Sequence, residues 1–279
     1  MIPFDTTEAM KSGVYASGTT GVGKSDILME IADKLMKEGV IVVVFDPTQD
    51  WQNRSSIQQW QKPNLSFLPI SHTSIIYDLS GMTSNRMQEM IEDFCNRIMY
   101  IKAHEKNFPK FFLIFEEAHT YFPQGCMTAK RCQNTVKMMT QGRNFGVRFA
   151  CITQFASLID KNAMRYMRQR YFGSTDEPND VEYIKRFFPK KNQEDINVTL
   201  GTLQAGQFIY KNGNKTELVQ IQPFKSETKP QEIVSSNPSP APPSIINKPH
   251  SNGATAKAMA TIIVAILWFL AIVYAISHR

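Results

Sequence analysis

Eight consecutive residues near the start of the chain have the types and spacing needed to hold the phosphates of a nucleotide. They fit the pattern Gly-x-x-x-x-Gly-Lys-Ser, in which glycines let backbone N–H groups approach phosphate oxygens. The lysine of this pattern reaches the β and γ phosphates, and the serine hydroxyl ligates Mg²⁺. The sequence therefore predicts binding of a nucleoside triphosphate with Mg²⁺ by Gly18, Thr19, Thr20, Gly21, Val22, Gly23, Lys24 and Ser25.

Two adjacent carboxylates provide a second chemical signal. Glu116 and Glu117 directly follow the apolar run 111–115, which predicts a buried strand. At the carboxyl end of such a strand, one acid can hold the Mg²⁺ shell and the other can polarise a water for attack on the γ-phosphate. We therefore predict Glu116 and Ser25 as metal ligands and Glu117 as the catalytic base.

Two further polar residues lie on either side of the apolar run 147–152. Gln154 follows this run, so its amide could sense the γ-phosphate or orient the attacking water from the tip of a strand. Arg143 precedes it, at the end of a helix and before a glycine-bearing loop. An arginine there could reach the nucleotide of a neighbouring subunit, or it could simply complement a helix C-terminus.

Elements that alternate along the chain must position these residues. Small and apolar residues at 14–17 predict a strand before the phosphate-binding loop, and the amphipathic stretch 27–35 predicts a helix after it. Such a helix directs the positive end of its dipole towards the anion. Further strands are expected at 40–45 and 74–77, with a long helix that begins near Ser84. This alternation predicts an α/β fold with a mostly parallel sheet flanked by helices, and 207–221 predicts a terminal hairpin.

In their order, these motifs resemble the HerA/FtsK superfamily of ring-forming DNA-pumping ATPases. The resemblance covers most of 12–222 and is closest to the compact archaeal and viral DNA-packaging ATPases. It rests on the loop 18–25, Asp46-Pro47, the stretch 77–81, Glu116-Glu117-Ala118-His119, and Gly142-Arg143 leading to Thr153-Gln154. Many relatives carry Asp where this chain has Glu116, and we expect the longer acid to be tolerated at the metal position.

The resemblance implies a P-loop NTPase fold of the RecA-like, ASCE type that hydrolyses ATP with Mg²⁺. It also implies a homo-oligomeric ring, hexameric in the family, with each nucleotide at a subunit boundary and Arg143 acting there as an arginine finger. Double-stranded DNA would pass through the channel of the ring, held without sequence preference. Candidate DNA contacts are Lys130, Arg131, Lys137, Arg165, Arg168 and Arg170.

The C-terminal part of the chain has a different composition from the rest. Residues 223–257 contain seven prolines and few large apolar residues, which predicts a disordered linker. Residues 258–276 form a charge-free apolar run of 19 residues, enough to cross about 30 Å of hydrocarbon as a helix. We therefore expect an ATPase domain over 1–222 on the cytoplasmic side, tethered to a host or virion membrane by a single-pass tail anchor at 258–276.

Composition adds weaker constraints. The net charge of +6 permits an anionic partner such as DNA but does not identify one. The four cysteines show neither a C-x-x-C pair nor a zinc spacing, so we expect reduced thiols in an intracellular protein. The residues after Met1 lack the basic and apolar regions of a secretory signal.

Three other functions fit parts of the sequence. A filamentous-phage morphogenesis ATPase of the zonula-occludens-toxin-like (Zot-like) type also joins a phosphate loop to a membrane segment. A GTPase switch would use the Asp-x-x-Gly pattern at 78–81, although no Asn-Lys-x-Asp follows to read guanine. A membrane scaffold could bind ATP without hydrolysing it, which Glu117 argues against. We expect a membrane-tethered ATPase that translocates double-stranded DNA, as in the packaging of a viral genome.

Overall fold

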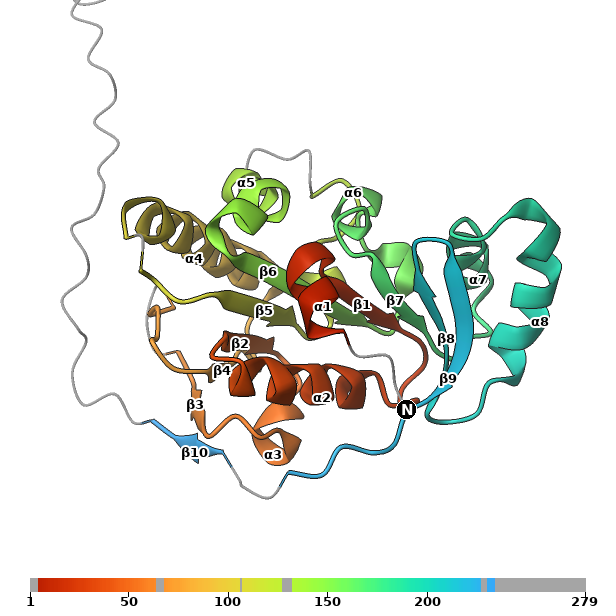
Figure 1. The fold of residues 1–279 in the computed structure, drawn as a ribbon, viewed down its shortest axis with the longest axis horizontal. Helices are drawn as coiled ribbons and strands as arrows, with labels where there is room; N and C mark the ends of the chain where they lie inside the picture. The colour runs from red at the N-terminus through yellow and green to blue at the C-terminus, as the bar shows by residue number, and fades with distance from the viewer. Residues whose placement is uncertain (1–4, 64–67, 106, 127–131, 227–229, 234–279) are drawn as a thin grey trace, which may run out of the picture. The chain divides into compact units, whose positions relative to one another are not determined.

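The computed structural model describes residues 5–63, 68–105, 107–126, 132–226 and 230–233. They form a ten-stranded sheet in the order β10-β3-β4-β2-β5-β6-β1-β7-β8-β9 (Figure 1). Every pairing from β10 to β7 is parallel, whereas β8 joins β7 and β9 in antiparallel fashion. The strands are β1 Val14–Ser17, β2 Ile41–Asp46, β3 Gln59–Gln61, β4 Ile75–Asp78, β5 Phe111–Phe115, β6 Val147–Thr153, β7 Gln169–Phe172, β8 Gln207–Asn212, β9 Lys215–Gln220 and β10 Gln231–Glu232.

Helices cover both faces of the sheet, as Figure 1 shows. The α-helices are α1 Thr6–Ser12, α2 Lys24–Lys37, α3 Trp51–Arg54, α4 Ser84–His104, α5 Gln133–Gln141, α6 Lys161–Met164, α7 Pro178–Lys185 and α8 Gln193–Thr202. Single turns of 3-10 helix lie at η1 Ala118–Thr120, η4 Gly142–Phe145, η5 Ala156–Leu158 and η6 Lys190–Asn192.

The core is divided by the sheet into two apolar clusters. In β2, the side chains of Ile41, Val43 and Phe45 join the cluster that packs under α4 and α5. Val42 and Val44 join the other cluster, which packs under α1 and α2. This alternation follows from the two-residue period of a strand, and it explains why β5 and the first five residues of β2 are apolar at every position.

The expected parallel α/β sheet is confirmed, as are the strands at 14–17, 40–45, 74–77, 111–115 and 147–152 to within one residue. The terminal hairpin is also confirmed, as β8 and β9. The long helix begins at Ser84, but its N-cap is Thr83, whose hydroxyl accepts from the N–H of Arg86. Strand β7 was not expected, because Gln169 and Arg170 interrupt its apolar pattern.

The chain continues along the sheet beyond 222. Gln231 and Glu232 pair in parallel with Gln59 and Trp60 as a short edge strand. The proline-rich sequence after 222 predicts no such strand, because two residues are too few for a periodic pattern to be visible. The rest of the expected linker from 234, and the expected tail anchor at 258–276, lie outside the described residues. Within the described ranges, none of the helices has the length and apolar character that a membrane span needs.

The expectation of four reduced cysteines is wrong for two of them. Cys126 and Cys132 form a disulfide, and their Cα atoms are 6.3 Å apart, within the span of such a bond. Their separation of six residues matches no short cysteine motif, so this pair could not be predicted from the sequence. Cys95 and Cys151 are buried free thiols.

Candidate active site

The phosphate-binding loop lies where β1 ends and α2 begins. Gly18, Gly21 and Gly23 all adopt positive φ angles, which an L side chain rarely adopts. A Cβ atom at Gly18 would also approach the backbone of Gly173 to 3.1 Å. No described side chain caps α2, so its first N–H groups are free to bond phosphate oxygens.

Lys24 opens helix α2 and is 7% exposed. Its ammonium group donates a hydrogen bond to the carbonyl oxygen of Thr19 at 2.9 Å, inside the loop. Burial lowers the pKa of Lys24, although the negative charges of Glu116 and Glu117 oppose this shift. A cation held beneath the loop in this way can bind phosphate oxygens as a point charge.

Glu116 and Ser25 meet at the base of the loop, as expected for a pair of metal ligands. The Ser25 hydroxyl lies 3.4 Å from Oε2 of Glu116, which is 4% exposed. The indole N–H of Trp51 donates to the same oxygen at 2.8 Å. Burial raises the pKa of Glu116 to about 8, because the Trp51 bond and the charge of Lys24 only partly stabilise the anion. A nearby cation would favour the ionised form of this carboxyl group.

Glu117 lies at the centre of a hydrogen-bond network that joins three strands. The side-chain amide of Gln154, at the end of β6, donates to its Oε1 at 2.6 Å. The oxygen of the same amide accepts from the Thr20 hydroxyl of the phosphate-binding loop at 3.0 Å. His119 lies between Glu117, at 3.4 Å, and the Thr153 hydroxyl, at 3.1 Å. The phosphate loop, Gln154 and Glu117 therefore form one connected unit.

Two properties of Glu117 suit a catalytic base. Burial raises its pKa, but the bonds from His119 and Gln154 outweigh burial, so the pKa lies below its ordinary value. Glu117 is therefore ionised at neutral pH and able to accept a proton. Its backbone has a φ of 50°, in the left-handed region that is unusual for a non-glycine residue. Such strain is found most often at functional sites.

Sequence reasoning missed Trp51 as part of this site. Asp46, at the end of β2, accepts hydrogen bonds from the backbone N–H groups of Thr48, Gln49 and Trp51 at 2.8, 3.0 and 2.9 Å. This turn fixes the fully buried Trp51 side chain against Glu116. The only available signal was the motif Asp46-Pro47, which marks a turn but does not indicate where the indole points.

The structure does not bring Arg143 to the phosphate-binding loop of its own chain. Arg143 is exposed and precedes β6, whereas Gln154 follows it. The seven residues of β6 span roughly 20 Å at about 3.3 Å per residue. Arg143 therefore lies at the opposite edge of the sheet and cannot contact a nucleotide bound by the same chain.

The candidate DNA contacts differ in accessibility. Lys137, Arg165 and Arg168 are exposed. Arg170 is half-buried in β7, where its guanidinium lies 4.5 Å from the centre of the Phe187 ring and donates to the carbonyl oxygen of Met164. These contacts make Arg170 a packing residue, so its expected role in binding DNA is not supported. Lys130 and Arg131 lie outside the described residues.

The GTPase alternative is also not supported by the positions of the strands. Asp78 ends β4, and three strands, β2, β5 and β6, separate β4 from the phosphate-loop strand β1. Neighbouring strands are about 4.8 Å apart, so Asp78 is roughly 19 Å away across the sheet. Its carboxylate instead accepts bonds from Gln49 and from the backbone of Ser80.

The order of strands at this edge explains how the site is assembled. Strand β6 lies between β1, which carries the phosphate loop, and β5, which carries the two glutamates. All three are parallel, so their carboxyl ends meet at one edge of the sheet. There they bring a glycine-rich loop, a buried lysine, a hydroxyl and two carboxylates within reach of one another. The fold is that of a P-loop NTPase.

Comparison with solved structures agrees with this fold. The genome-packaging NTPase B204 of Sulfolobus turreted icosahedral virus 2, in complex with AMPPCP, superposes with a TM-score of 0.57 at 17% identity, covering 77% of this chain and 99% of B204. The bacterial conjugative coupling protein TrwBΔN70 superposes with a TM-score of 0.56 at 10% identity, covering 78% of this chain and 86% of TrwBΔN70. VirB4 of Thermoanaerobacter pseudethanolicus superposes with a TM-score of 0.51 at 10% identity, covering 76% of this chain and 90% of VirB4.

The sequence alone gives no such match. No protein-family model matches it, and no curated protein sequence does. The fold expected from the ordered motifs is nevertheless confirmed, because the similar structures include a viral genome-packaging NTPase, a conjugative coupling protein and VirB4.

Proposed function

We propose that the chain is an ATPase that uses hydrolysis to translocate double-stranded DNA. The observation that carries this proposal is the connection between Thr20, Gln154 and Glu117, which joins the phosphate loop to a candidate base through 3.0 and 2.6 Å hydrogen bonds. A connection of this kind suits a site in which the state of the γ-phosphate is sensed by the residue that activates water. A protein that merely stores a nucleotide does not need it.

The residues at the loop fit ATP with Mg²⁺. Residues 18–25 offer backbone donors and Lys24 for the phosphates, and Ser25 and Glu116 offer two oxygens for the metal. Mg²⁺ is usually held by one or two protein oxygens together with substrate phosphates. Bound there, the ion would neutralise charge that develops on the phosphates. The raised pKa of Glu116 suits this role, because it means that the buried carboxylate is unfavourable without a cation beside it. A bound Mg²⁺ would stabilise the ionised form.

Glu117 would accept the proton of the attacking water. Gln154 holds the carboxylate of Glu117 in one orientation, and Thr20 holds Gln154. The backbone N–H of Gln154 also lies 3.4 Å from the second carboxylate oxygen. The base therefore keeps a fixed position next to the loop, which lowers the entropic cost of reaching the transition state.

Arg143 requires a second subunit. Because it lies about one strand length from its own phosphate loop, it can stabilise a transition state only at the nucleotide of a neighbour. We therefore propose a homo-oligomeric ring in which Arg143 acts in trans, hexameric as the resemblance to the HerA/FtsK superfamily suggests. B204 is named as a genome-packaging NTPase and TrwBΔN70 as a conjugative coupling protein, which supports DNA as the cargo.

Tethering to a membrane through 258–276 is a separate part of the proposal. It rests on the apolar sequence of that segment and would place the ATPase domain on the cytoplasmic side. The same segment favours the one alternative we retain, a Zot-like filamentous-phage ATPase that extrudes or assembles virions.

ATP hydrolysis by the full chain, with and without double-stranded DNA across a salt series, tests this function. A DNA translocase should hydrolyse ATP faster with DNA, and the stimulation should fade as salt weakens contacts to phosphate. Hydrolysis that ignores DNA at every salt concentration would favour the morphogenesis ATPase. If the chain binds ATP without turnover under any condition, the catalytic assignment of Glu117 is wrong.

A further inference from the structure

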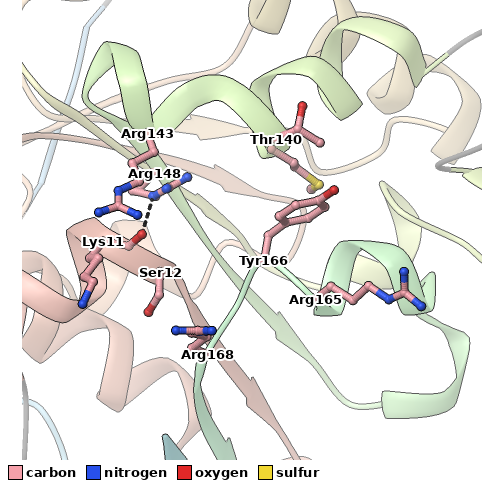
Figure 2. A pocket seen from close by; sticks show the side chains of 9 residues that line it. Lys11, Ser12, Thr140, Arg143, Arg148, Arg165, Tyr166 and Arg168 are labelled. Atoms are coloured by element: carbon pink, nitrogen blue, oxygen red, sulfur yellow. Dashed lines mark hydrogen bonds between the residues drawn. The ribbon is translucent and has the colours of Figure 1, made fainter. Parts of the chain in front are cut away.

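A basic cavity lies at the edge of the sheet opposite the phosphate loop, where β6, β1 and β7 begin (Figure 2). Its volume is about 240 Å³, and five of its lining residues are basic: Lys11, Arg143, Arg148, Arg165 and Arg168. They come from α1, η4, β6 and the segment between α6 and β7. No acidic residue lines the cavity within the described part of the chain.

Arg148 is the most buried of these cations, at 6% exposed. Its Nε donates to the carbonyl oxygen of Lys11 at 3.1 Å, in the last turn of α1. Burial lowers its pKa to about 10, and the positive charge of Arg143 acts in the same direction. A buried charge normally has an opposite charge beside it. Here the charge of Arg143, which acts on Arg148, has the same sign.

The cations of the cavity are poorly neutralised by the protein itself. Lys11 forms an ion pair with Glu8 at 3.6 Å, but no described carboxylate pairs with Arg143, Arg148 or Arg168. The bond to the carbonyl oxygen of Lys11, in the last turn of α1, uses only Nε of Arg148. The two terminal nitrogens of its guanidinium remain available to bind a ligand. Guanidinium groups gathered in a cavity match the geometry of phosphate oxygens, which accept paired N–H bonds.

We propose that this cavity binds a phosphate oxyanion, separate from the phosphates held by the loop 18–25 of the same chain. The ligand is compact, because Arg148 at the floor of the cavity is almost inaccessible and only a small group can enter to reach it. Two sources have this chemistry: a free phosphate or pyrophosphate, and the terminal phosphate of a nucleotide that a second copy of the chain holds. The second source rests on the proposed ring, in which Arg143 reaches a neighbour's nucleotide, whereas binding of a free phosphate depends neither on that ring nor on hydrolysis or DNA translocation.

The cavity offers its own control residue. In Figure 2 the guanidinium groups of Arg143 and Arg148 lie close together beside Lys11, whereas that of Arg165 points away from them. Substitution of Arg165 therefore removes the same charge from the same region without removing a group that faces Arg148. Arg143→Gln and Arg168→Gln remove exposed side chains, so a loss of binding in these variants does not depend on the folding of Arg148→Gln.

The test is calorimetric titration of pyrophosphate into the full chain carrying Lys24→Ala, which removes the main cation of the phosphate loop. One saturable site per chain should remain. Adding Arg148→Gln, Arg143→Gln or Arg168→Gln should weaken it about tenfold or more, the expected effect of losing a charged hydrogen bond. Adding Arg165→Gln should change it less than about twofold, by the same measure. Equal losses in all four variants would show only a general charge effect and would overturn the proposal.

A second arm separates the two sources. Labelled Lys24→Ala chains are mixed with wild-type chains loaded with ATPγS, and association is followed by fluorescence anisotropy. If the chains associate, if Arg148→Gln in the labelled chain abolishes this association, and if free pyrophosphate does not bind, the phosphate belongs to the nucleotide of a second copy. The proposal fails if neither arm shows binding that depends on Arg148. It also fails if Arg148→Gln affects only the binding of a short DNA duplex, because the cavity would then be a DNA contact.

Discussion

The two edges of the sheet differ in how their charged groups are satisfied. At the carboxyl edge, Glu116 accepts from Trp51, and Glu117 accepts from Gln154 at 2.6 Å. At the amino edge, Arg143 and Arg148 lie together, and neither has an acidic partner among the described residues. One edge carries acids that the chain itself holds in place, and the other carries cations that the chain does not neutralise.

This difference indicates which groups each edge can contribute to ATP hydrolysis. The carboxyl edge contains, within one chain, the groups that we propose to bind phosphate and metal and to act as the base. The amino edge supplies positive charge that cannot reach a nucleotide bound by the same chain, because the length of β6 separates it from the loop. In a ring, an amino edge would face the carboxyl edge of a neighbour, and opposite charges would then meet.

Removing Arg143 should have the largest effect. We expect Arg143→Gln to lower kcat for ATP by about 10³-fold or more, since an arginine finger contributes about that much to phosphoryl transfer. ATP binding should change little, because Arg143 is far from its own loop. Hydrolysis assays and nucleotide titrations of the same preparations measure the two quantities. Lys190→Gln, an exposed cation in η6, is the matched charge control.

A mixing experiment determines whether Arg143 acts in trans. Chains with Arg143→Gln keep an intact loop and base, and chains with Glu117→Gln keep an intact arginine. If the two edges meet across a boundary, mixing the two inactive variants should restore part of the activity. No recovery at any ratio, in rings shown to contain both chains, would contradict the complementarity of the two edges.

Glu117→Gln should lower kcat by about 10² to 10⁴-fold, the usual contribution of a general base. The amide cannot accept a proton, but it has nearly the same shape, so ATP should still bind. Glu89→Gln on the exposed surface of α4 controls for the loss of one negative charge. Turnover by Glu117→Gln close to that of the wild type would show that another group activates the water.

Glu116→Gln should stabilise the chain at high pH in the absence of Mg²⁺. The folded pKa of Glu116 is about 8, well above the usual value for this side chain, so the folded state binds a proton more tightly than the unfolded state. The contribution of this bound proton to the free energy of unfolding is fully present below about pH 4.3 and is lost as the pH rises through about 8. We expect Glu116→Gln to exceed the wild type by more than about 1 kcal/mol at pH 8.5 and to approach it at pH 5.

Chemical denaturation at the two pH values, with and without Mg²⁺ and ATPγS, measures this difference. Mg²⁺ and ATPγS should reduce the difference in stability between Glu116→Gln and the wild type, because a cation beside the Glu116 carboxylate offsets the free-energy cost of burying its charge. A gap independent of pH would show that the effect comes from packing against Trp51 and not from ionisation.

Much of the carboxyl edge could be predicted from the sequence, because its residues lie in or directly after the glycine-rich loop and the apolar strands. Gln154 and Glu117 end neighbouring strands, so their proximity follows from a parallel sheet. Trp51 could not be predicted, because a turn held by Asp46 positions it and no periodic pattern describes such a turn. The roles of these residues stay predictions until the variants are measured.

The amino edge could be predicted much less well. Strand β7 has no clear apolar alternation, so the position of Arg168 just before it was not visible in the sequence. The cavity joins Lys11 to Arg148, which are 137 residues apart. Such a grouping depends on strand order, and the order β6-β1-β7 is set by crossovers that local patterns do not encode.

The smallest expected effect concerns His119, which contacts the base without being one. Its Nδ1 lies 3.4 Å from Glu117 and helps to keep the pKa of that carboxylate low. In His119→Asn this pKa should rise, so the acidic limb of the pH–rate profile should move to higher pH. The rate should fall below that of the wild type at acidic pH and recover as the pH rises, where Glu117 is again ionised. His104→Asn, on the exposed end of α4, should leave the profile unchanged. An equal rate loss at every pH would instead show that His119 holds Glu117 in place sterically, and that the carboxyl edge is tuned by geometry more than by charge.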